Sequence, residues 1–434
     1  MATHVSDLAR LAGRTATVHG WVKTLRLQRK LQFVLVRDGT GVVQVVNKRT
    51  EPPSELEQQL DALTLESAVE VTGTVEVNPV VKLGGLELRA ESVTVVAAAE
   101  PGLPVEEDSA PEIRLDWRYL DVRRTGQLLT FQAQDTVEQA MREVAHAEGF
   151  VEMHTPKLMA TASESGSEVF RIDYFGGSAY LAQSPQFFKQ MAIGAGVEKF
   201  FEIGPVFRAE PSFTSRHATE FTGVDVEIGW ISGVEDVMAF EERMLTRVLE
   251  RVRDEHGPAI AERFGVEITV PEQPFPRIPM REALATLRAQ GWDPEGVRDD
   301  LDTEGERALA AWVNETHGHE FVFVTRFPSS VRPFYHHRPA DDPTVTDSFD
   351  LLWNGIEITT GAQREHRYEM LLKQAAEKGL DVGPMGDYLN VFRYGTPPHG
   401  GFGLGLNRLV MVLLGLSSIR ESTFLFRGPH RLNP

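Results

Sequence analysis

Hydrophobic and polar residues alternate along short runs in the first hundred residues. A period of two is typical of strands with one buried face. The runs cover Thr15–Leu25, Gln32–Asp38, Gly41–Asn47, Ala68–Val77 and Leu86–Val96. A stretch with helical spacing, Ser54–Leu65, lies between the third and fourth runs. Five strands with a helix at this place predict a small Greek-key barrel over residues 1–100, and the oligonucleotide-binding fold is one of several that share the pattern.

The alternation stops at Ala97–Pro111, which is rich in Pro, Glu and Ala. We therefore expect a linker or hinge over residues 101–125 and a second domain over residues 126–434. Apolar residues at helical spacing predict a helix over Thr130–Ala147 in that domain. Expected strands cover Val151–Thr155, Lys199–Arg208, Phe221–Trp230, Glu320–Thr325, Ser348–Trp353 and Ile356–Thr360. The mixture predicts an α+β domain in which helices flank an antiparallel sheet.

Composition narrows the class of protein. The chain has 434 residues and no cysteine, which excludes disulfides, thiolate metal sites and cysteine nucleophiles. Its longest apolar runs, such as Val93–Ala99 and Leu409–Leu414, are too short to span a bilayer, so we expect a cytoplasmic protein without a membrane partner. The net charge is -19, yet residues 1–50 hold nine Lys or Arg against two Asp. Binding depends on local charge, so this basic segment leaves a nucleic-acid partner open, although a solvated basic face would look the same.

One face of the expected strand Phe221–Trp230 is polar. It presents Phe221, Asp225 and Glu227, because residues two apart share a face. The preceding strand ends at Arg208, and the loop between the two strands contains Arg216 and His217. Arginines among small polar residues suit an anion clamp. A salt-bridged sheet surface would show the same pattern.

Two carboxylates flank the expected hairpin turn at Asn354-Gly355. A two-residue turn pairs Leu352 with Glu357 and Asp350 with Thr359, which places Asp350 and Glu357 diagonally on one face. Diagonal neighbours lie about 7–8 Å apart, close enough to hold hard cations between them. Oxygen ligands suit Mg²⁺ bound together with a phosphate. Exposed acids on an edge hairpin are the alternative.

A glycine-rich run, Gly400–Asn407, leads through Arg408 into the apolar stretch Leu409–Leu414. Glycine permits close approach of the backbone to a ligand, and an arginine at a helix start can meet a phosphate. The run lacks the βαβ context of a dinucleotide-binding fingerprint.

Taken in this order, these segments resemble the three signature motifs of class II aminoacyl-tRNA synthetases. The helix and strand that end at Pro156 resemble the first motif, Phe207-Arg208-Ala209-Glu210 through Phe221 the second, and Gly401 through Arg408 the third. A barrel followed by the catalytic domain resembles the subclass that handles aspartate, asparagine and lysine. The compact length resembles the archaeal and eukaryotic aspartyl-tRNA synthetases. The first motif implies a homodimer.

The resemblance implies a site for ATP and Mg²⁺. Arg208 is expected to hold the α-phosphate and Arg408 the γ-phosphate, with Phe221 stacked on adenine. Glu210, Arg216, His217 and Glu357 complete the expected ATP site. Asp350, Glu357 and Thr360 are the expected metal ligands.

Finer matches imply L-aspartate as the amino acid. The segment Gln183–Gln190 and the arginine of Gly361-Ala362-Gln363-Arg364 resemble the aspartyl pocket, and a substrate carboxylate between Lys189 and Arg364 would be doubly charge-paired, with Arg364 able to bind it through two hydrogen bonds. The expected aspartate ligands are Glu164, Ser184, Gln186, Lys189, Asp225, Thr360 and Arg364. The adjacent His336 and His337 are interpreted as packing and surface residues, because neighbours on a strand point to opposite faces.

In the barrel, Arg26, Phe33 and Gln44 match anticodon-reading positions, and Lys23 follows Gly20-Trp21-Val22, where discriminating members of the family tend to carry a bulky aromatic residue. The resemblance therefore implies tRNA(Asp) as a partner and leaves tRNA(Asn) open as a second one, with a tRNA-dependent amidotransferase acting afterwards. Alternatives are an asparaginyl-tRNA synthetase, an aspartate-to-asparagine ligase on the same fold, and a catalytically inactive RNA-binding paralogue.

Overall fold

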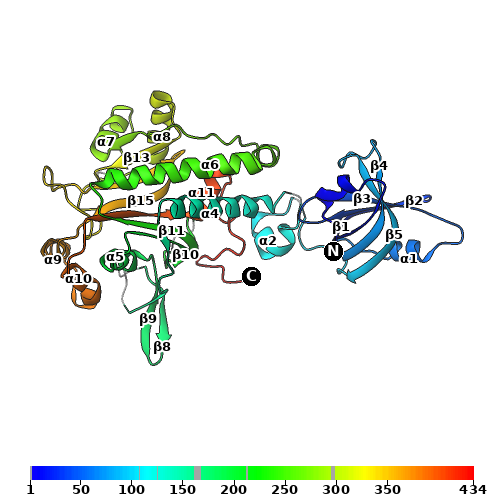
Figure 1. Cartoon of the computed structure of the whole chain (residues 1–434), viewed down its shortest axis with the longest axis horizontal. Coiled ribbons are helices and arrows are strands. Elements are labelled where there is room, and N and C mark those ends of the chain that lie inside the picture. The colour runs from blue at the N-terminus through cyan, green and yellow to red at the C-terminus, as the bar shows by residue number, and fades with distance from the viewer. Residues whose placement is uncertain (1, 107, 125, 161–167, 212–213, 295–298) are drawn as a thin grey trace. The chain divides into compact units, whose positions relative to one another are not determined.

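The computed structural model describes residues 2–434 except 107, 125, 161–167, 212–213 and 295–298. The chain folds into two compact units, residues 1–128 and 129–434. Residues 101–125, the expected linker, contain the short helices α2 (Pro111–Asp116) and α3 (Arg118–Asp121) and group with the first unit. The helices and strands are labelled in Figure 1.

The first unit is a closed five-stranded barrel with the strand order β1-β2-β3-β5-β4. Its elements are η1 (Val5–Leu11), β1 (Thr15–Leu27), β2 (Leu31–Arg37), β3 (Val42–Lys48), α1 (Glu55–Asp61), β4 (Ala68–Val77) and β5 (Leu86–Ala97). Alternate valines of the strands fill the barrel, as the period of two predicts. Ser54 and Glu57 form a capping box at the start of α1, which fixes the helix between β3 and β4. The predicted barrel is confirmed.

The second unit is built on an eight-stranded sheet with the order β12-β13-β14-β15-β16-β11-β10-β6. The strands are β6 (Val151–Glu152), β10 (Lys199–Phe207), β11 (Glu220–Gly229), β12 (Arg277–Pro279), β13 (Phe321–Thr325), β14 (Ser348–Trp353), β15 (Ile356–Arg364) and β16 (His399–Gly405). All pairs are antiparallel except β6 with β10 and β12 with β13. The α+β class is confirmed, and the sheet is mixed rather than purely antiparallel. A small sheet of β7 (Leu158–Met159), β9 (Gly177–Leu181) and β8 (Arg171–Tyr174) stands beside it.

Helices cover both faces of the large sheet (Figure 1). The back face packs on α4 (Leu129–Ala147), α6 (Val234–Phe264) and α11 (Leu406–Leu413) in the largest core cluster. Two smaller clusters lie on the front: one contains α7 (Met280–Ala289) and α8 (Thr303–His317), the other α5 (Gln186–Gly194), α9 (Tyr368–Glu377) and α10 (Gly386–Phe392). Along β11, Val224, Val226 and Ile228 belong to the back core. Asp225 and Glu227 must therefore face the front, between the two smaller clusters.

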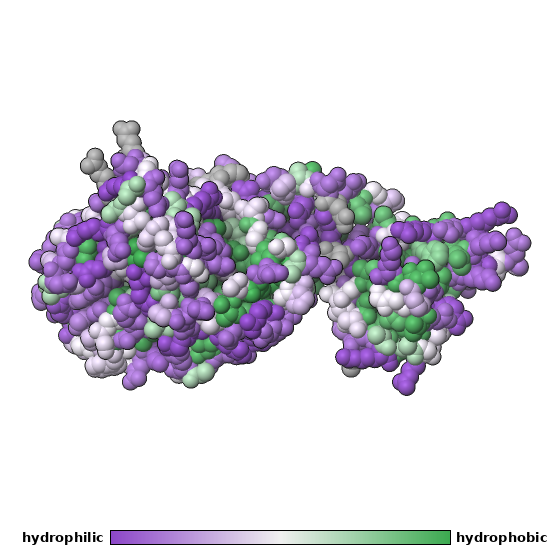
Figure 2. Space-filling view, turned by 90° about the horizontal axis from the view of Figure 1, so that it is seen from above, coloured by the Kyte–Doolittle hydropathy of each residue, from purple (hydrophilic) through white to green (hydrophobic). Residues whose placement is uncertain are grey.

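No helix of the described residues is long and apolar enough to cross a membrane. On the face shown in Figure 2, hydrophilic side chains predominate and hydrophobic ones are interspersed.

One carboxyl group lies in the back core without a charged partner. Glu241 on α6 is fully buried, and neither of its oxygens forms a hydrogen bond with a described residue. Burial raises the pKa of Glu241 to about 8, although the nearby Thr359 hydroxyl lowers it in part. The folded protein therefore carries Glu241 protonated at neutral pH, whereas the unfolded chain releases this proton near the ordinary glutamate pKa of 4.5. The contribution of Glu241 to the free energy of unfolding therefore falls as pH rises from about 4.5 to about 8.

Glu241→Gln is expected to stabilise the protein, because glutamine keeps the neutral shape and needs no proton. The gain is on the order of 3 kcal/mol at pH 7 and grows from pH 5 to pH 8. Thermal unfolding midpoints across this pH range measure it, with the exposed Glu262→Gln on the same helix as control. A variant that is less stable than the wild type at pH 8 contradicts the assignment.

Candidate active site

A cavity of about 330 Å³ opens on the front face of the large sheet. It brings together residues from β10, β11, β15 and β16, the loop after β10, and α5. Of the site residues expected from the sequence, it is lined by Arg208, Glu210, Arg216, His217, Phe221, Glu357, Arg408, Ser184, Gln186, Lys189, Asp225, Thr360 and Arg364. Asp350 lies just outside this lining, and Glu164 falls outside the described residues.

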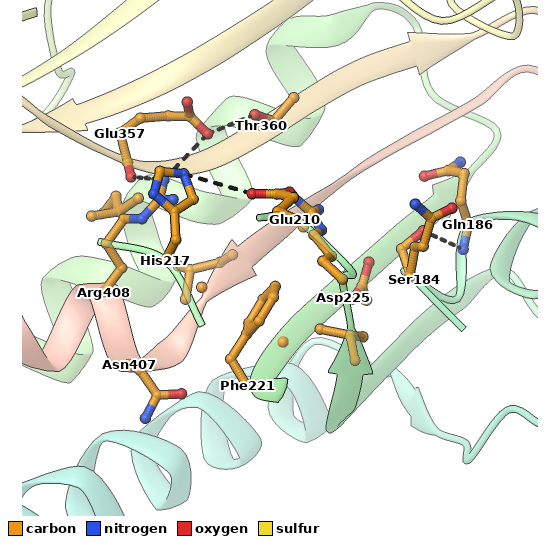
Figure 3. A pocket seen from close by; sticks show the side chains of 18 of the residues that line it. Ser184, Gln186, Glu210, His217, Phe221, Asp225, Glu357, Thr360, Asn407 and Arg408 are labelled. Carbon is orange, nitrogen blue, oxygen red and sulfur yellow. Dashed lines mark hydrogen bonds and ion pairs between the residues drawn. The ribbon is translucent and has the colours of Figure 1, made fainter. Parts of the chain in front are cut away.

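The cavity has two chemically different ends (Figure 3). At one end, Glu357, Thr360, His217 and Arg408 are gathered; at the other, Ser184, Gln186 and Asp225. Arg408 donates from Nη1 to the Glu357 carbonyl oxygen at 2.6 Å. It also lies 3.6 Å from the Glu357 carboxylate. The first end therefore combines cations with carboxylates.

The second motif contributes an aromatic platform beside an arginine. The Arg208 guanidinium lies 5.5 Å from the centre of the Phe221 ring and 3.6 Å from Glu210. His217 lies 3.8 Å from the same carboxylate. Burial lowers the pKa of His217, Glu210 opposes the shift, and Arg408 and Arg208 add to it. The imidazole is therefore mainly neutral at pH 7 and can accept or donate a hydrogen bond.

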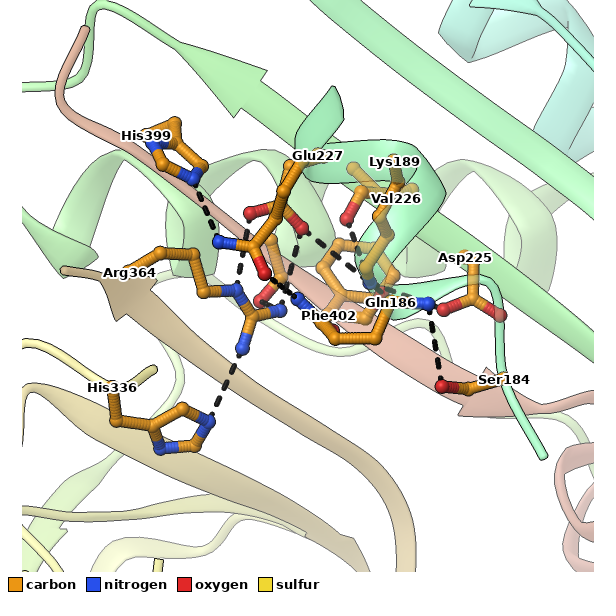
Figure 4. A network of polar contacts seen from close by, with 12 residues as sticks. Ser184, Gln186, Lys189, Asp225, Val226, Glu227, His336, Arg364, His399 and Phe402 are labelled. Carbon is orange, nitrogen blue, oxygen red and sulfur yellow. Dashed lines mark hydrogen bonds and ion pairs between the residues drawn. The ribbon is translucent and has the colours of Figure 1, made fainter. Parts of the chain in front are cut away.

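Two buried cations and two buried carboxylates form the floor of the other end (Figure 4). Lys189 donates to the Asp225 carboxylate at 3.0 Å and lies 3.5 Å from Glu227. It donates as well to the backbone oxygens of Val226 and Phe402. An ammonium has three donors, so these contacts use all of them. Lys189 therefore acts on a ligand through the electrostatic effect of its positive charge and by holding Asp225, because no N–H of its ammonium is left to donate.

Arg364 is held in the same way. Its Nε donates to Glu227 at 3.0 Å, Nη2 donates to Glu227 and the Gly401 oxygen, and Nη1 donates to His336. These bonds engage four of the five guanidinium N–H groups. Glu227 occupies the fork of Nε and Nη2, so one Nη1 donor remains for a substrate carboxylate where two were expected from the sequence.

Burial and charge act in opposite directions on the two carboxylates. Burial alone would raise the pKa of Glu227, but Arg364 and Lys189 hold it below the usual value. Burial raises the pKa of Asp225 and Lys189 opposes the shift only in part. The contrast follows from geometry, since Glu227 lies between both cations and Asp225 contacts one.

Steric crowding explains why β16 contains glycines at positions next to β11, which the sequence alone did not show. A Cβ on Gly401 would lie 2.0 Å from the Val226 oxygen and 2.4 Å from the Glu227 carboxylate. A Cβ on Gly403 would come within 3.3 Å of Asp225. The expected role of this run was close approach to a ligand. In the structure the glycines make room for the carboxylates of the neighbouring strand.

The adjacent histidines His336 and His337 lie in different surroundings. It is 2% exposed, lines the cavity and accepts the Arg364 bond through Nε2, whereas His337 pairs with Asp347 at 2.7 Å. Burial lowers the pKa of His336 well below its usual value, and Arg364 and Arg332 add to the shift, so the ring is neutral. The position of His336 in the cavity was not expected, because the coil segment before it has no periodicity.

A bulge in β15 decides which side chains face the cavity. Leu352 pairs with Glu357 as predicted, but Asp350 pairs with Thr360 and not with Thr359. The register shift turns Thr360 to the front, where its hydroxyl donates to the Glu357 carboxylate at 3.1 Å. In the register that the sequence predicted, Glu357 and Thr360 would lie on opposite faces. The bulge therefore brings three of the expected metal-site oxygens together.

The match of family models extends over both units. A model described as tRNA synthetases class II (D, K and N) matches residues 110–427, and one described as an OB-fold nucleic acid binding domain matches residues 16–96. The chain belongs to the class II tRNA synthetases. The two matches confirm the class II family and the oligonucleotide-binding barrel that the sequence motifs implied.

Relatives of this synthetase carry aspartate-ligase names. It is 42% identical over its whole length to the aspartate–tRNA(Asp/Asn) ligase of Aeropyrum pernix, covering 99% of that protein. It is 40% identical to the aspartate–tRNA(Asp) ligase of Pyrococcus abyssi, with complete coverage of both chains. Among solved structures it matches the asparaginyl-tRNA synthetase of Pyrococcus horikoshii complexed with asparaginyl-adenylate, with a TM-score of 0.93, 33% identity and complete coverage of both chains. The fold is thus shared by enzymes for either amino acid.

The synthetase has a donor set that suits a hard cation. Asp350 and Glu357 face one side of the sheet, and Asp350 Oδ1 is buried without a hydrogen bond to a described residue. Burial raises the pKa of Asp350, Arg332 lowers it and Glu357 raises it. Arg332, which the sequence analysis missed, donates to Asp350 Oδ2 at 2.5 Å. Asp350 and Glu357 are two carboxylates, and within the described residues no cluster of three or more His, Cys, Asp or Glu side chains could hold a metal ion by itself.

The barrel of the synthetase places its expected anticodon residues on one face. Arg26 pairs with Phe33, and Gln44 pairs with Leu35, two residues further along the same face. This face points outward, because the alternate residues Val34 and Val36 of β2 point into the core. Lys23 lies at a bulge in β1, between the paired residues Val22 and Thr24.

Proposed function

We propose that this synthetase is an aspartate–tRNA ligase, which joins L-aspartate to tRNA in two steps driven by ATP. The observation that carries the proposal is the buried set of Lys189, Asp225, Glu227 and Arg364 at the end of the cavity opposite Arg408. Family relatives with aspartate-ligase names over the whole chain support it.

In the first step an α-carboxylate oxygen of aspartate attacks the α-phosphorus of ATP. A carboxylate–phosphorus bond forms and the bond to pyrophosphate breaks. In the second, the terminal ribose hydroxyl of tRNA attacks the carbonyl carbon and AMP leaves. The reaction needs no nucleophilic side chain, so the protein contributes position and charge.

Each end of the cavity has a proposed ligand. Phe221 stacks on adenine, Arg208 holds the α-phosphate, and Arg408 with His217 and Arg216 holds the terminal phosphate. Asp225, Ser184 and Gln186 hold the substrate ammonium. Gln186 is oriented for this, since its amide donates to Gln190 at 2.9 Å. Mg²⁺ on Asp350, Glu357 and Thr360 would neutralise phosphate charge.

Aspartate is favoured over asparagine by electrostatics at the Arg364 end. Its β-carboxylate can accept the remaining Arg364 donor as a charge-assisted hydrogen bond, whereas an asparagine amide oxygen would accept it as an uncharged and weaker partner. ATP–pyrophosphate exchange with aspartate, asparagine and lysine tests the function. Aspartate alone should support exchange; equal rates with asparagine would favour an asparaginyl enzyme, and no exchange with any of them an inactive RNA-binding paralogue.

Relaxed tRNA choice is the second part of the proposal, with tRNA(Asp) and tRNA(Asn) both as partners. Their anticodons differ in the third base, C against U, which exchanges one amino donor for a carbonyl acceptor. Lys23 has a flexible ammonium that can donate to a carbonyl oxygen of either base and forms a poor steric wall. The name of the Aeropyrum relative fits this choice.

Both transcripts should accept aspartate with kcat/KM values within about tenfold, which is about 1.4 kcal/mol. Aminoacylation of each transcript with aspartate measures the ratio. Lys23→Trp is expected to increase the preference for tRNA(Asp), with the exposed Lys48→Trp in the same barrel as control. A preference of about 10⁴ in the wild type would show discrimination by an unpaired buried group. Asp-tRNA(Asn), once made, would need a tRNA-dependent amidotransferase. We expect the enzyme to act in the cytoplasm together with its tRNA substrates and this amidotransferase.

A homodimer through the first motif completes the proposal. The strand β6 lies at the edge of the large sheet, where an unpaired strand can meet a second copy. Val151, Met153 and Leu158 on and after this strand are 50%, 39% and 49% exposed. Sedimentation at micromolar concentration should give the dimer mass, and Val151→Glu should give the monomer. A monomeric wild type would contradict the proposal.

A further inference from the structure

An ion pair joins the loop of the second motif to helix α8, far away in the sequence. Arg216 donates from Nη1 to Glu306 at 2.9 Å, and the two residues are 90 positions apart. Both side chains are largely buried, at 13% and 15% exposure. A buried, charge-assisted bond with this geometry is strong, and it fixes one end of the guanidinium.

The ion pair does not use the other terminal nitrogen of the Arg216 guanidinium, Nη2. Arg216 lines the cavity, and its Nη2 is buried without a hydrogen-bond partner among the described residues. A buried donor without an acceptor is unfavourable, because it has lost its hydrogen bonds to water and gained none in the protein. An arginine with one nitrogen anchored and the other unsatisfied is prepared for an anionic ligand.

The surroundings of Glu306 locate this donor at the phosphate end of the cavity. Burial raises the pKa of Glu306 to about 7, Glu357 raises it as well, and Arg216 and Arg408 lower it. The charges of Glu357 and Arg408, which mark that end, thus act on Glu306, and Arg216 lines the same cavity as both of them. Helix α8 packs on β13 and β14 through Leu309 and Val313, so the backbone that carries Glu306 is held in place by the core.

We propose that Glu306 is a positioning residue for ATP: it fixes Arg216 so that Nη2 meets the β- or γ-phosphate. The proposal rests on the proposed ATP-dependent function and adds α8 to the site. Glu306 has no contact with the substrate of its own and acts through Arg216. A purely structural ion pair would stabilise the loop without regard to how many phosphates the nucleotide carries.

The affinities for ATP and for AMP, measured by calorimetry without aspartate, separate the two roles. Glu306→Ala should raise the Kd for ATP about tenfold, or about 1.4 kcal/mol. It should leave the Kd for AMP within about twofold. Glu306→Gln, which keeps an acceptor without the charge, should fall between the wild type and Glu306→Ala. Glu304→Ala, an exposed acid in the same helical turn, is the matched control.

A double-variant cycle tests that Glu306 acts through Arg216. Arg216→Ala and the double variant Arg216→Ala with Glu306→Ala should bind ATP equally weakly, because residues that act as a unit are not additive. Additive losses, an unchanged Kd for ATP, or equal losses for ATP and AMP overturn the proposal. Should Glu306→Ala not fold, the Gln variant gives the same comparison. A wild type that does not bind ATP would instead refute the proposed function.

Discussion

Asp350→Ala is expected to lower the rate of aspartate-dependent pyrophosphate exchange by about 10²–10³-fold, and Glu357→Ala by a similar factor. The two carboxylates face one side of the sheet beside the proposed phosphate site, and an oxygen of Asp350 is buried without a bond to a described residue. Removal of either would leave the developing charge on pyrophosphate less neutralised.

The magnesium dependence identifies the cause. Both variants should need a higher Mg²⁺ concentration for half-maximal exchange and recover in part when it is raised. Asp350 also binds Arg332, so Arg332→Met separates loss of that ion pair from loss of a metal ligand: it should not shift the Mg²⁺ requirement upward. Glu369→Ala, an exposed acid in the same unit, is the control. Wild-type activity in either carboxylate variant would show that this carboxylate does not hold the metal ion.

Lys189→Met is expected to lower the free energy of unfolding by about 3–5 kcal/mol, because it leaves Asp225 and Glu227 with too little positive charge in a buried site. Activation of aspartate should fall with it, since Asp225 loses its anchor. The affinity for ATP should change little, because Lys189 lies at the far end of the cavity.

Thermal unfolding and separate KM values for aspartate and ATP measure these effects. The double variant Lys189→Met with Asp225→Asn should recover part of the lost stability, since it removes one of the unpaired charges. Lys199→Met is the matched control, a half-buried lysine of β10 that donates to a single backbone oxygen. Equal rises of both KM values would place Lys189 outside the amino-acid site. A variant as stable as the wild type would show that Asp225 and Glu227 do not need the charge of Lys189.

Helix α8 extends the list of elements that form the site. The second and third motifs account for parts of β10, β11 and β16, but Glu306 lies outside them and contacts the loop of the second motif only in the folded chain. The affinity for the terminal phosphates would then depend on how α8 packs. Substitutions in the core under α8, such as at Leu309, would be expected to change ATP affinity before they change aspartate affinity.

Local patterns in the sequence determined the elements and their faces. Alternation placed Phe221, Asp225 and Glu227 on one side of β11, and the turn at Asn354-Gly355 set the pairing of Leu352 with Glu357, as found. Both residues of this turn have a positive φ, 49° and 76°. Such features need only neighbours along the chain, because strand periodicity and turn chemistry are short-range.

Contacts between distant residues decided the rest, and these depend on tertiary packing. The bulge in β15 turned Thr360 toward Glu357 and Thr359 toward the back core, which no local pattern specifies. Glu227 took the Arg364 fork because Gly401 on the adjacent strand leaves room for its carboxylate. Ion pairs and bulges form where strands and helices meet, and the energy of a buried charge depends on partners that only the folded chain supplies.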